Sequence, residues 1–196
     1  MDALLRRHAW RPQGIQVLAC GRGPGSFTGL RSSLAFGAGW ALGVEGLRLM
    51  AVGTLHAWAE AFAPAAAGEA LVLLDGRRSQ VYRGQLQRRG RVWTDIVEPS
   101  LVDLGETEGL APRGAPGVSS PGAVLLTDMP AAFARHPGWT ALPVDLDSAA
   151  LALAVGRLAC ASLESGAAGP PWEPDYLRRS EAQLLWERLH PSSPAS

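Results

Sequence analysis

The 196-residue sequence contains no lysine and no asparagine, so arginine supplies all 18 of its basic side chains. The absence of lysine excludes a Schiff-base lysine, a Ser-Lys dyad and the lysine of a phosphate-binding P-loop. Charged residues make up only 18% of the chain, and the formal net charge is zero. This balance argues against a broad electrostatic surface for nucleic acid, because such surfaces are typical of basic domains.

Cysteine and histidine are scarce and scattered. Cys20 and Cys160 lie outside any C-x-x-C pattern, and none of the four histidines pairs with another at metal-binding spacing. We therefore predict no metal site and interpret both cysteines as buried thiols. The N-terminus lacks the apolar stretch of a signal peptide, and no apolar run reaches the roughly 18 residues of a membrane span. The sequence predicts a cytoplasmic protein without membrane contact.

The first third of the chain alternates between strand and helix patterns. We predict strands at 15–20 and 47–52, each followed by a helix, at 28–44 and 54–62. Ser26 or Thr28 is the expected N-cap of the first of these helices. This alternation is typical of a parallel sheet in an α/β fold.

The rest of the chain has a different order. Residues 71–99 predict three successive strands with turns near Gly76 and at 88–90, which is typical of an antiparallel meander. A buried strand at 122–128 and an apolar helix capped by Asp147 or Ser148 follow. We predict two lobes: residues 1–66 form the remainder of an N-terminal lobe, and residues 67–172 form the second. A C-terminal helix at 175–190 is expected to pack on the N-terminal lobe.

The glycine-rich stretch from Cys20 to Arg31, "CGRGPGSFTGLR", is the most unusual in the chain. It fails the P-loop pattern because it lacks lysine, and it fails G-x-G-x-x-G because Ser26 replaces the third glycine. It also fails the G-x-S-x-G pattern of a nucleophile elbow, because the serine, Ser26, is flanked directly by Gly25 and Phe27. Two interpretations stay open: a helix N-terminus that binds phosphate weakly, or a packing device in which Phe27 fills a pocket.

The helix that follows carries two rows of small residues. Ser33, Gly37 and Ala41 are spaced by four, and so are Ala35, Gly39 and Gly43. Because each glycine inside a helix costs about 1 kcal/mol relative to alanine, we predict close approach of another helix, from this chain or from a second protein. The expected interface residues are Phe27, Leu30, Ser33, Leu34, Gly37, Ala38 and Ala41.

Asp75 is the best candidate for a functional carboxylate. It ends an apolar strand, and strand carboxyl ends border ligand crevices in α/β sheets. With Gly25, Ser26 and Thr28 it forms our candidate nucleotide-binding set. An equally weighted alternative makes Asp75 a turn former before Gly76. His56 is expected to be solvated or locally hydrogen-bonded, and we assign no catalytic residue.

Three segments together resemble one family. Residues 23–31 read "GPGSFTGLR", which is the hallmark of the TsaB (YeaZ) family, and "LLDGRRSQVY" at 73–82 and "EPDYLRR" at 173–179 are similar to two further family segments. The resemblance implies a two-lobe, actin-like ATPase fold of ribonuclease H-like topology. It also implies a non-catalytic subunit that pairs with a catalytic TsaD-type subunit for threonylcarbamoyl transfer to adenosine of tRNA.

The resemblance also suggests partners. A TsaE-type ATPase is expected in the complex, tRNA is contacted indirectly, and a homodimer and a bound ATP or ADP with Mg²⁺ at a subunit interface are left open. The family's opening strands have no counterpart here, so we expect an incomplete N-terminal lobe. A misassigned start codon is the favoured explanation, and a short protein that borrows structure from a partner is the alternative. The alternative function is a nucleotide-binding ATPase or acyltransferase that acts on its own.

Overall fold

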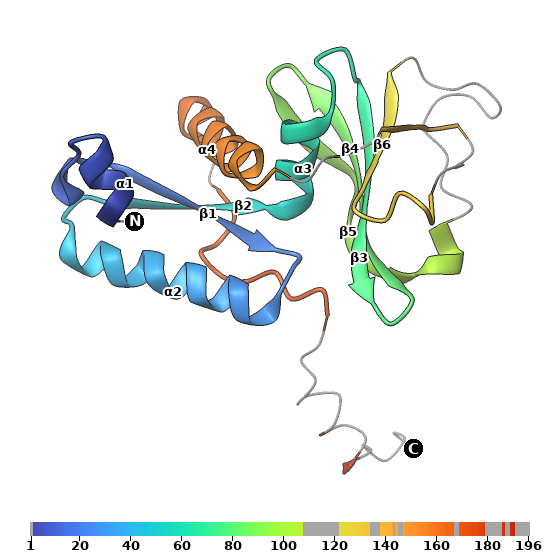
Figure 1. Cartoon of the computed structure of the whole chain (residues 1–196), viewed down its shortest axis with the longest axis horizontal. Coiled ribbons are helices and arrows are strands. Elements are labelled where there is room, and N and C mark those ends of the chain that lie inside the picture. Colours follow the sequence, from blue (N-terminus) through green and yellow to red (C-terminus); the bar gives the residue numbers. More distant parts are fainter. Residues whose placement is uncertain are drawn as a thin grey trace.

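The computed structural model describes residues 2–107, 122–133, 138–142, 144, 147–166, 169–178, 186 and 189–190. These residues form two sheets with helices around them (Figure 1). The helices are α1 (Asp2–Arg7), α2 (Phe27–Gly43), α3 (Thr54–Phe62) and α4 (Ser148–Ser165), with 3-10 turns at Pro12–Gly14 and Leu104–Thr107. The strands are β1 (Val17–Gly23), β2 (Arg48–Gly53), β3 (Glu69–Arg77), β4 (Gln80–Arg89), β5 (Val92–Asp103), β6 (Ala123–Thr127) and β7 (Thr140–Leu142).

The first sheet consists of β1 and β2, which pair in parallel as predicted. One of its faces packs on α3 and α4 through a cluster that includes Met50, Val52 and Ala154. Helix α2 covers the opposite face, where the Cys20 thiol contacts the Ser33 carbonyl at 3.8 Å. Strand β1 runs to Gly23 instead of ending near residue 20, so the first glycines of the glycine-rich stretch belong to the strand.

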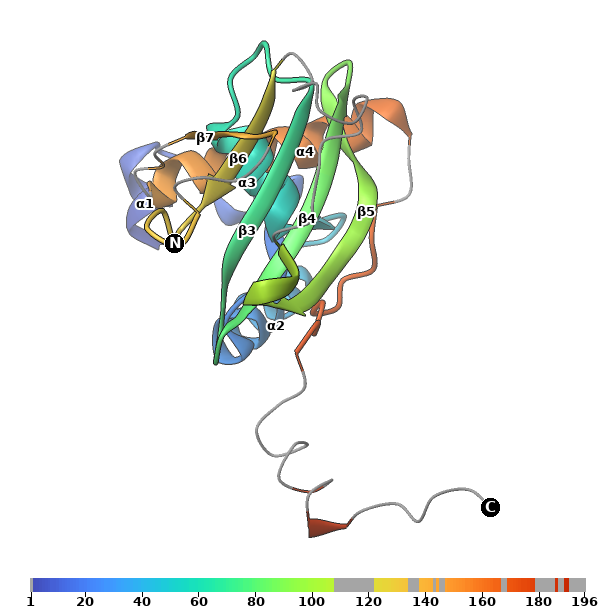
Figure 2. The same ribbon diagram turned by 90° about the vertical axis from the view of Figure 1, so that its right-hand side faces the viewer.

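The second sheet has the strand order β5-β4-β3-β6-β7. Its β3-β4-β5 part is an antiparallel meander, which confirms the prediction, and β6 pairs with β3 in parallel. Figure 2 shows these strands side by side, with α3 and α4 behind them. The first turn lies at 78–79, close to Gly76 as predicted. The three-residue strand β7 was not predicted, because it is too short to show a pattern.

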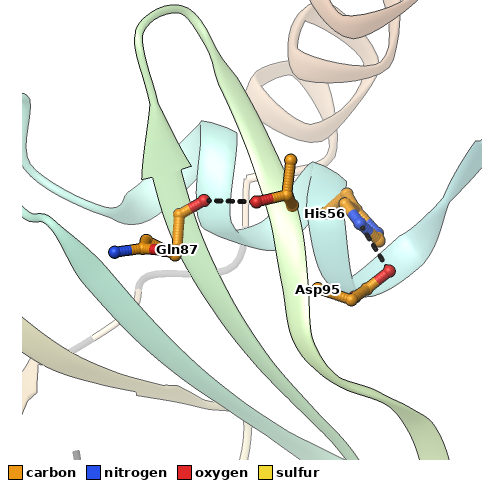
Figure 3. A network of polar contacts seen from close by, with 4 residues as sticks. His56, Gln87 and Asp95 are labelled. Atoms are coloured by element: carbon orange, nitrogen blue, oxygen red, sulfur yellow. Dashed lines mark hydrogen bonds and ion pairs between the residues drawn. The ribbon is translucent and has the colours of Figure 1, made fainter. Parts of the chain in front are cut away.

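Helix α3 lies between the two sheets and contributes to the core of each. Leu55 and Trp58 belong to the cluster under the second sheet, and Ala57 belongs to the cluster under the first. A polar contact adds to this link, because Nε2 of His56 lies 3.3 Å from Oδ2 of Asp95 on β5 (Figure 3). His56 therefore has a side-chain partner from the second sheet. The division of the chain near residue 66 stays a prediction.

Asp147 is the N-cap of helix α4, and its side chain accepts a hydrogen bond from the Ala149 amide at 2.8 Å, which confirms one of the two predicted caps. Its Cys160 is exposed, so the prediction of a buried thiol there is wrong. Ser148–Ser165 also has the length and hydropathy of a membrane span. One such helix is weak evidence for a membrane span.

Residues 169–178 return to the first sheet in a non-helical segment, which we call the strap. The indole Nε1 of Trp172 donates a hydrogen bond to the Leu34 carbonyl at 3.1 Å. The Asp175 amide donates to the Arg22 carbonyl of β1 at 2.7 Å. The predicted helix at 175–190 is wrong for residues 175–178, and most of its remainder lies outside the described residues.

Candidate functional site

A cleft of about 770 Å³ lies where the start of α2, the carboxyl ends of β3 and β6, and the strap meet. This volume falls in the range of small-molecule sites, roughly 300–1,000 Å³. Its lining residues are Pro24, Gly25, Ser26, Phe27, Thr28, Thr54, Trp58, Leu74, Asp75, Gly76, Arg77, Tyr82, Asp128, Leu151, Asp175, Tyr176, Leu177 and Arg178. The four residues of the predicted nucleotide-binding set, Gly25, Ser26, Thr28 and Asp75, are all among them.

The glycine-rich stretch positions the N-terminus of α2 at this cleft. Ser26 is the N-cap, and its hydroxyl accepts a hydrogen bond from the Gly29 amide at 3.3 Å. The amide groups of a helix's first turn carry a partial positive charge, which favours an acceptor or an anion nearby. Gly23, whose φ is +124°, allows the strap to approach, because a Cβ there would lie 2.7 Å from the Asp175 carbonyl oxygen. The glycines therefore serve packing and also shape the cleft.

Asp75 forms part of the β3-β4 turn and also lines the cleft. Its Oδ1 accepts a hydrogen bond from the Arg77 amide at 2.7 Å, which holds the β3-β4 turn. Arg77, Arg78 and Ser79 in that turn all have positive φ, a conformation that costs free energy for residues with a side chain. Asp75 also lines the cleft. The turn-forming interpretation is thus confirmed, and a ligand-binding role at the same position stays a prediction.

Asp128 is a cleft residue that the sequence analysis missed. It directly follows β6, and its Oδ1 accepts a hydrogen bond at 2.9 Å from the amide of Asp75, which lies two residues before the end of β3. Removal of water raises the pKa of the Asp128 carboxyl group, although hydrogen bonds from backbone amides oppose this effect. The rule that selected Asp75, a polar residue at the carboxyl end of a parallel strand, could have selected Asp128 as well.

The raised pKa of Asp128 predicts a pH dependence of stability. The folded chain binds this proton more tightly than the unfolded chain, so the carboxyl group lowers stability as the pH rises above its ordinary pKa of 3.8. Asp128→Asn keeps an oxygen for the Asp75 amide but has no charge. We expect the variant to be slightly more stable at neutral pH, with a difference that shrinks as the pH falls towards 3.8. Urea denaturation across this pH range measures it, and a pH-independent difference would contradict the assignment.

The strap closes one side of the cleft. The Arg178 guanidinium donates a hydrogen bond to the Gly76 carbonyl of β3, so the strap contacts both sheets. Burial raises the pKa of the neighbouring Tyr82 hydroxyl, and the positive charge of Arg178 partly offsets this shift. No sequence pattern pointed to these contacts, because they join residues about a hundred positions apart.

The predicted interface residues of α2 divide into two groups. Leu30, Leu34 and Gly37 are buried by the chain itself, whereas Phe27 and Ala38 are exposed and Ser33 and Ala41 are half-buried. A Cβ on Gly37 would lie 2.4 Å from the Trp172 ring, so this glycine accommodates the strap. This row was predicted to allow close approach of another helix, from this chain or from a second protein. At Gly37 the close neighbour comes from this chain, but it belongs to the non-helical strap.

The other small-residue row lies on what we call the outer face of α2, which consists of Ala35, Phe36, Gly39, Trp40, Leu42 and Gly43. Phe36 is 50% exposed and Leu42 is 92% exposed. The Phe36 and Trp40 rings pack edge to face with centroids 5.5 Å apart. No atom would lie within 4 Å of a Cβ built on Gly39 or Gly43, so the space beside these glycines is open among the described residues.

Comparison with known proteins agrees with this geometry. A family model described as "TsaD: tRNA N6-adenosine threonylcarbamoyltransferase" matches residues 1–170. The "tRNA threonylcarbamoyladenosine biosynthesis protein TsaB" of Escherichia coli (strain K12) is 37% identical over 95 residues, and that of Haemophilus influenzae is 34% identical over 99 residues. The chain belongs to the TsaB (YeaZ) family. The matched stretches cover 45% and 50% of this TsaB-family chain but 41% of each relative, so the chain spans less than half of their length.

Solved structures confirm the predicted fold class of this TsaB-family chain. A Pseudomonas aeruginosa protein described as similar to peptidase YEAZ superposes with a TM-score of 0.71 at 23% identity, covering 90% of this chain and 80% of that one. YeaZ from Pseudomonas aeruginosa gives a TM-score of 0.69 at 22% identity, with 89% and 80% covered. The actin-like, ribonuclease H-like α/β fold is thus shared. Among the described residues, the first sheet has two strands.

Proposed function

We propose that the chain is a partner subunit in the biosynthesis of threonylcarbamoyladenosine on tRNA and that it binds a catalytic TsaD-type subunit through the outer face of α2. The observation that carries this proposal is the exposed apolar surface of α2 around two unfilled glycines. The names of the two curated relatives support the assignment of this chain to threonylcarbamoyladenosine biosynthesis. A TsaE-type ATPase would join the complex, and tRNA would be contacted through the partner.

The chemistry of the outer face fits a helix of another protein. Gly39 and Gly43 lie one turn apart on one side of α2, so a facing helix can approach the backbone closely. Phe36 and Leu42 flank this row and can fill hydrophobic pockets on a partner. Exposed apolar surface of this kind is costly in water and is typical of protein–protein contacts.

Substitution of the outer face tests this proposal. We expect Phe36→Asp to weaken binding of a TsaD-type subunit by roughly 30-fold or more, because a hot-spot aromatic contributes at least about 2 kcal/mol. Leu153→Asp on α4 is the matched control, since Leu153 is 55% exposed and lies away from α2. Calorimetric titration of both variants measures the affinities, and equal losses would contradict the assignment of the partner surface to α2.

The outer face of α2 could instead bind the same face of a second copy of this chain and form a homodimer. Two copies that pair through α2 would bury Phe36 and Leu42 in each other's surface, so the TsaD-type subunit would have to displace one copy. Sedimentation analysis of the chain alone and with the partner distinguishes these forms. Phe36→Asp would shift both equilibria towards separate chains.

A second candidate is an ATPase or acyltransferase that works without a partner. One observation favours this candidate: a single cleft is lined by all four residues of the predicted nucleotide-binding set, Gly25, Ser26, Thr28 and Asp75. Asp75 and Asp128 could hold a magnesium ion with a nucleotide, although no group of three metal-ligating side chains is close enough to do so among the described residues. Calorimetric titration with ATP and Mg²⁺ tests this candidate, and it fails if no binding and no hydrolysis are observed.

A further inference from the structure

The tip of the β4-β5 hairpin carries three arginines. Arg88 and Arg89 end β4, and Gly90 and Arg91 form the short turn before β5. Gly90 has a φ of +62°, which glycine adopts readily in a tight turn. Because β3 and β4 are antiparallel, this tip lies at the opposite end of the second sheet from the β3-β4 turn and the cleft, and it also lies away from α2 (Figure 1, Figure 2).

Several contacts hold the hairpin and one of its arginines in place. The Arg88 amide donates a hydrogen bond to the Gly68 carbonyl at 2.9 Å, and the Thr94 hydroxyl donates one to the Gln87 carbonyl at 3.3 Å (Figure 3). Arg88 pairs with Trp93 across the two strands, and its guanidinium lies over the Trp93 ring, 4.4 Å from the centroid. Trp93 is buried, so it gives the guanidinium a fixed support.

The cations at the tip have no acceptor of opposite charge within the part of the chain that the structure describes. None of the three arginines forms an ion pair with a carboxylate there. Nε of Arg88 and Nε1 of Trp93 are buried without a hydrogen-bond partner. Arg89 reaches only Oε1 of Gln87, at the long distance of 3.5 Å. A set of charged donors without acceptors fits an oxyanion from outside the chain.

The neighbouring carboxylates have other partners. Glu69 pairs with Gln87 in the sheet register, and its carboxylate accepts a hydrogen bond from Nε2 of Gln85 at 2.7 Å. Asp95 lies 3.3 Å from His56. The formal net charge of the whole chain is zero, so the molecule has no general attraction for a polyanion. The positive charge of the tip is therefore a local feature.

We propose that the tip of the β4-β5 hairpin binds the phosphate backbone of RNA, with Arg88, Arg89 and Arg91 each contacting a phosphate. Neighbouring residues of a strand point to opposite faces, so a polynucleotide that crosses the tip can meet all three arginines. A guanidinium matches the geometry of a phosphate group. The choice of RNA over an acidic peptide rests on the proposed function, whereas the arginine site does not. This contact would add to the one made through the partner subunit.

Titration of the full chain with a fluorescently labelled single-stranded oligouridylate tests the proposal, because uracil stacks weakly and the probe reports mainly on backbone contacts. Three phosphate contacts predict a slope of about −2 for the logarithm of the binding constant against the logarithm of the salt concentration. Combined replacement of Arg88, Arg89 and Arg91 by glutamine should weaken binding at low salt by at least about tenfold and bring the slope close to zero.

Two further variants separate the site from general charge effects. Arg48→Gln is the matched control, because it removes the same charge from an exposed arginine at the start of β2 in the first sheet, and it should leave the affinity within about twofold. Arg88→Lys keeps the charge but loses the planar group that lies over Trp93, so it should weaken binding several-fold. Retained affinity in Arg88→Lys would contradict the supporting role of Trp93.

Folding is checked by circular dichroism and the urea midpoint. Arg91→Gln alone keeps the test valid if the triple variant is disturbed, because this exposed turn residue should reduce the slope by about 0.7 without affecting the strands. The proposal is overturned if the oligouridylate does not bind, if Arg48→Gln weakens binding as much as Arg91→Gln, or if an oligoglutamate of equal charge displaces the RNA at equal concentration.

The same triple variant distinguishes this proposal from the proposed partner binding. Its outer face of α2 is unchanged, so it should bind a TsaD-type subunit with the affinity of the unsubstituted chain. Loss of RNA binding with retained partner binding supports a separate site on the hairpin. Equal loss of both would place the hairpin in the partner interface and overturn the assignment to RNA.

Discussion

Leucine at position 37 should destabilise the chain, whereas leucine at position 39 should stabilise it. A Cβ on Gly37 would lie 2.4 Å from Cζ2 and 2.9 Å from Cη2 of Trp172, so a larger side chain must displace this ring. Overpacking of this kind typically costs about 1–3 kcal/mol, and we expect a loss of roughly 2–3 kcal/mol. Urea denaturation of the isolated chain measures the change.

Gly39 is the matched control, because it lies in the same helix with no neighbouring atom within 4 Å of its built Cβ. Leucine there gains up to about 1 kcal/mol of helix propensity. The same substitution should block the close approach of a partner helix, so Gly39→Leu separates pairing from stability. Changes of stability in the same direction for both variants would contradict the opposite orientations of the two small-residue rows.

Truncation of Leu55 should have the largest effect on stability among the substitutions considered. Leu55 is fully buried, belongs to the core between α3 and the second sheet, and lies against Gly84 of β4. Leu55→Ala should cost about 2–5 kcal/mol, because the transfer free energy of the side chain is lost and a cavity is left. Leu42→Ala, at a position 92% exposed, should change the free energy of unfolding by less than about 0.5 kcal/mol.

A double-mutant cycle sharpens this prediction. A Cβ on Gly84 would lie 2.7 Å from Cδ1 of Leu55, so Gly84→Ala alone should destabilise the chain. In the Leu55→Ala background that methyl group enters the space left by the leucine, and the double variant should recover part of the loss. Additive losses in urea denaturation would show that the two residues do not share this contact.

The sequence predicted most elements correctly where local chemistry determines them. The apolar runs of β1, β2 and β6, and the caps at Ser26 and Asp147, act within a few residues and therefore show in the sequence. The antiparallel meander was also predictable, because its strands follow each other with short turns.

Non-local contacts account for the elements that were predicted incorrectly. The strap has helix-forming residues after Asp175, but the Asp175 amide bonds to β1 and Trp172 bonds to α2. Helix α2 is apolar on two sides, so its pattern alone does not reveal which side the chain covers. Asp128, Tyr176 and Arg178 meet Asp75 in the cleft through sheet pairing and the path of the strap, which local sequence patterns do not encode.

The strap also determines when the first part of the chain can fold. Trp172 and Leu34, which share a hydrogen bond, are 138 positions apart in sequence. At typical synthesis rates, on the order of ten seconds pass between the appearance of α2 and that of the residue that covers it. During this time the inner side of α2 lacks its tryptophan, although the helix emerges early from the ribosome. The N-terminal part of the chain is therefore synthesised first, but its packing is complete only after the strap has been synthesised.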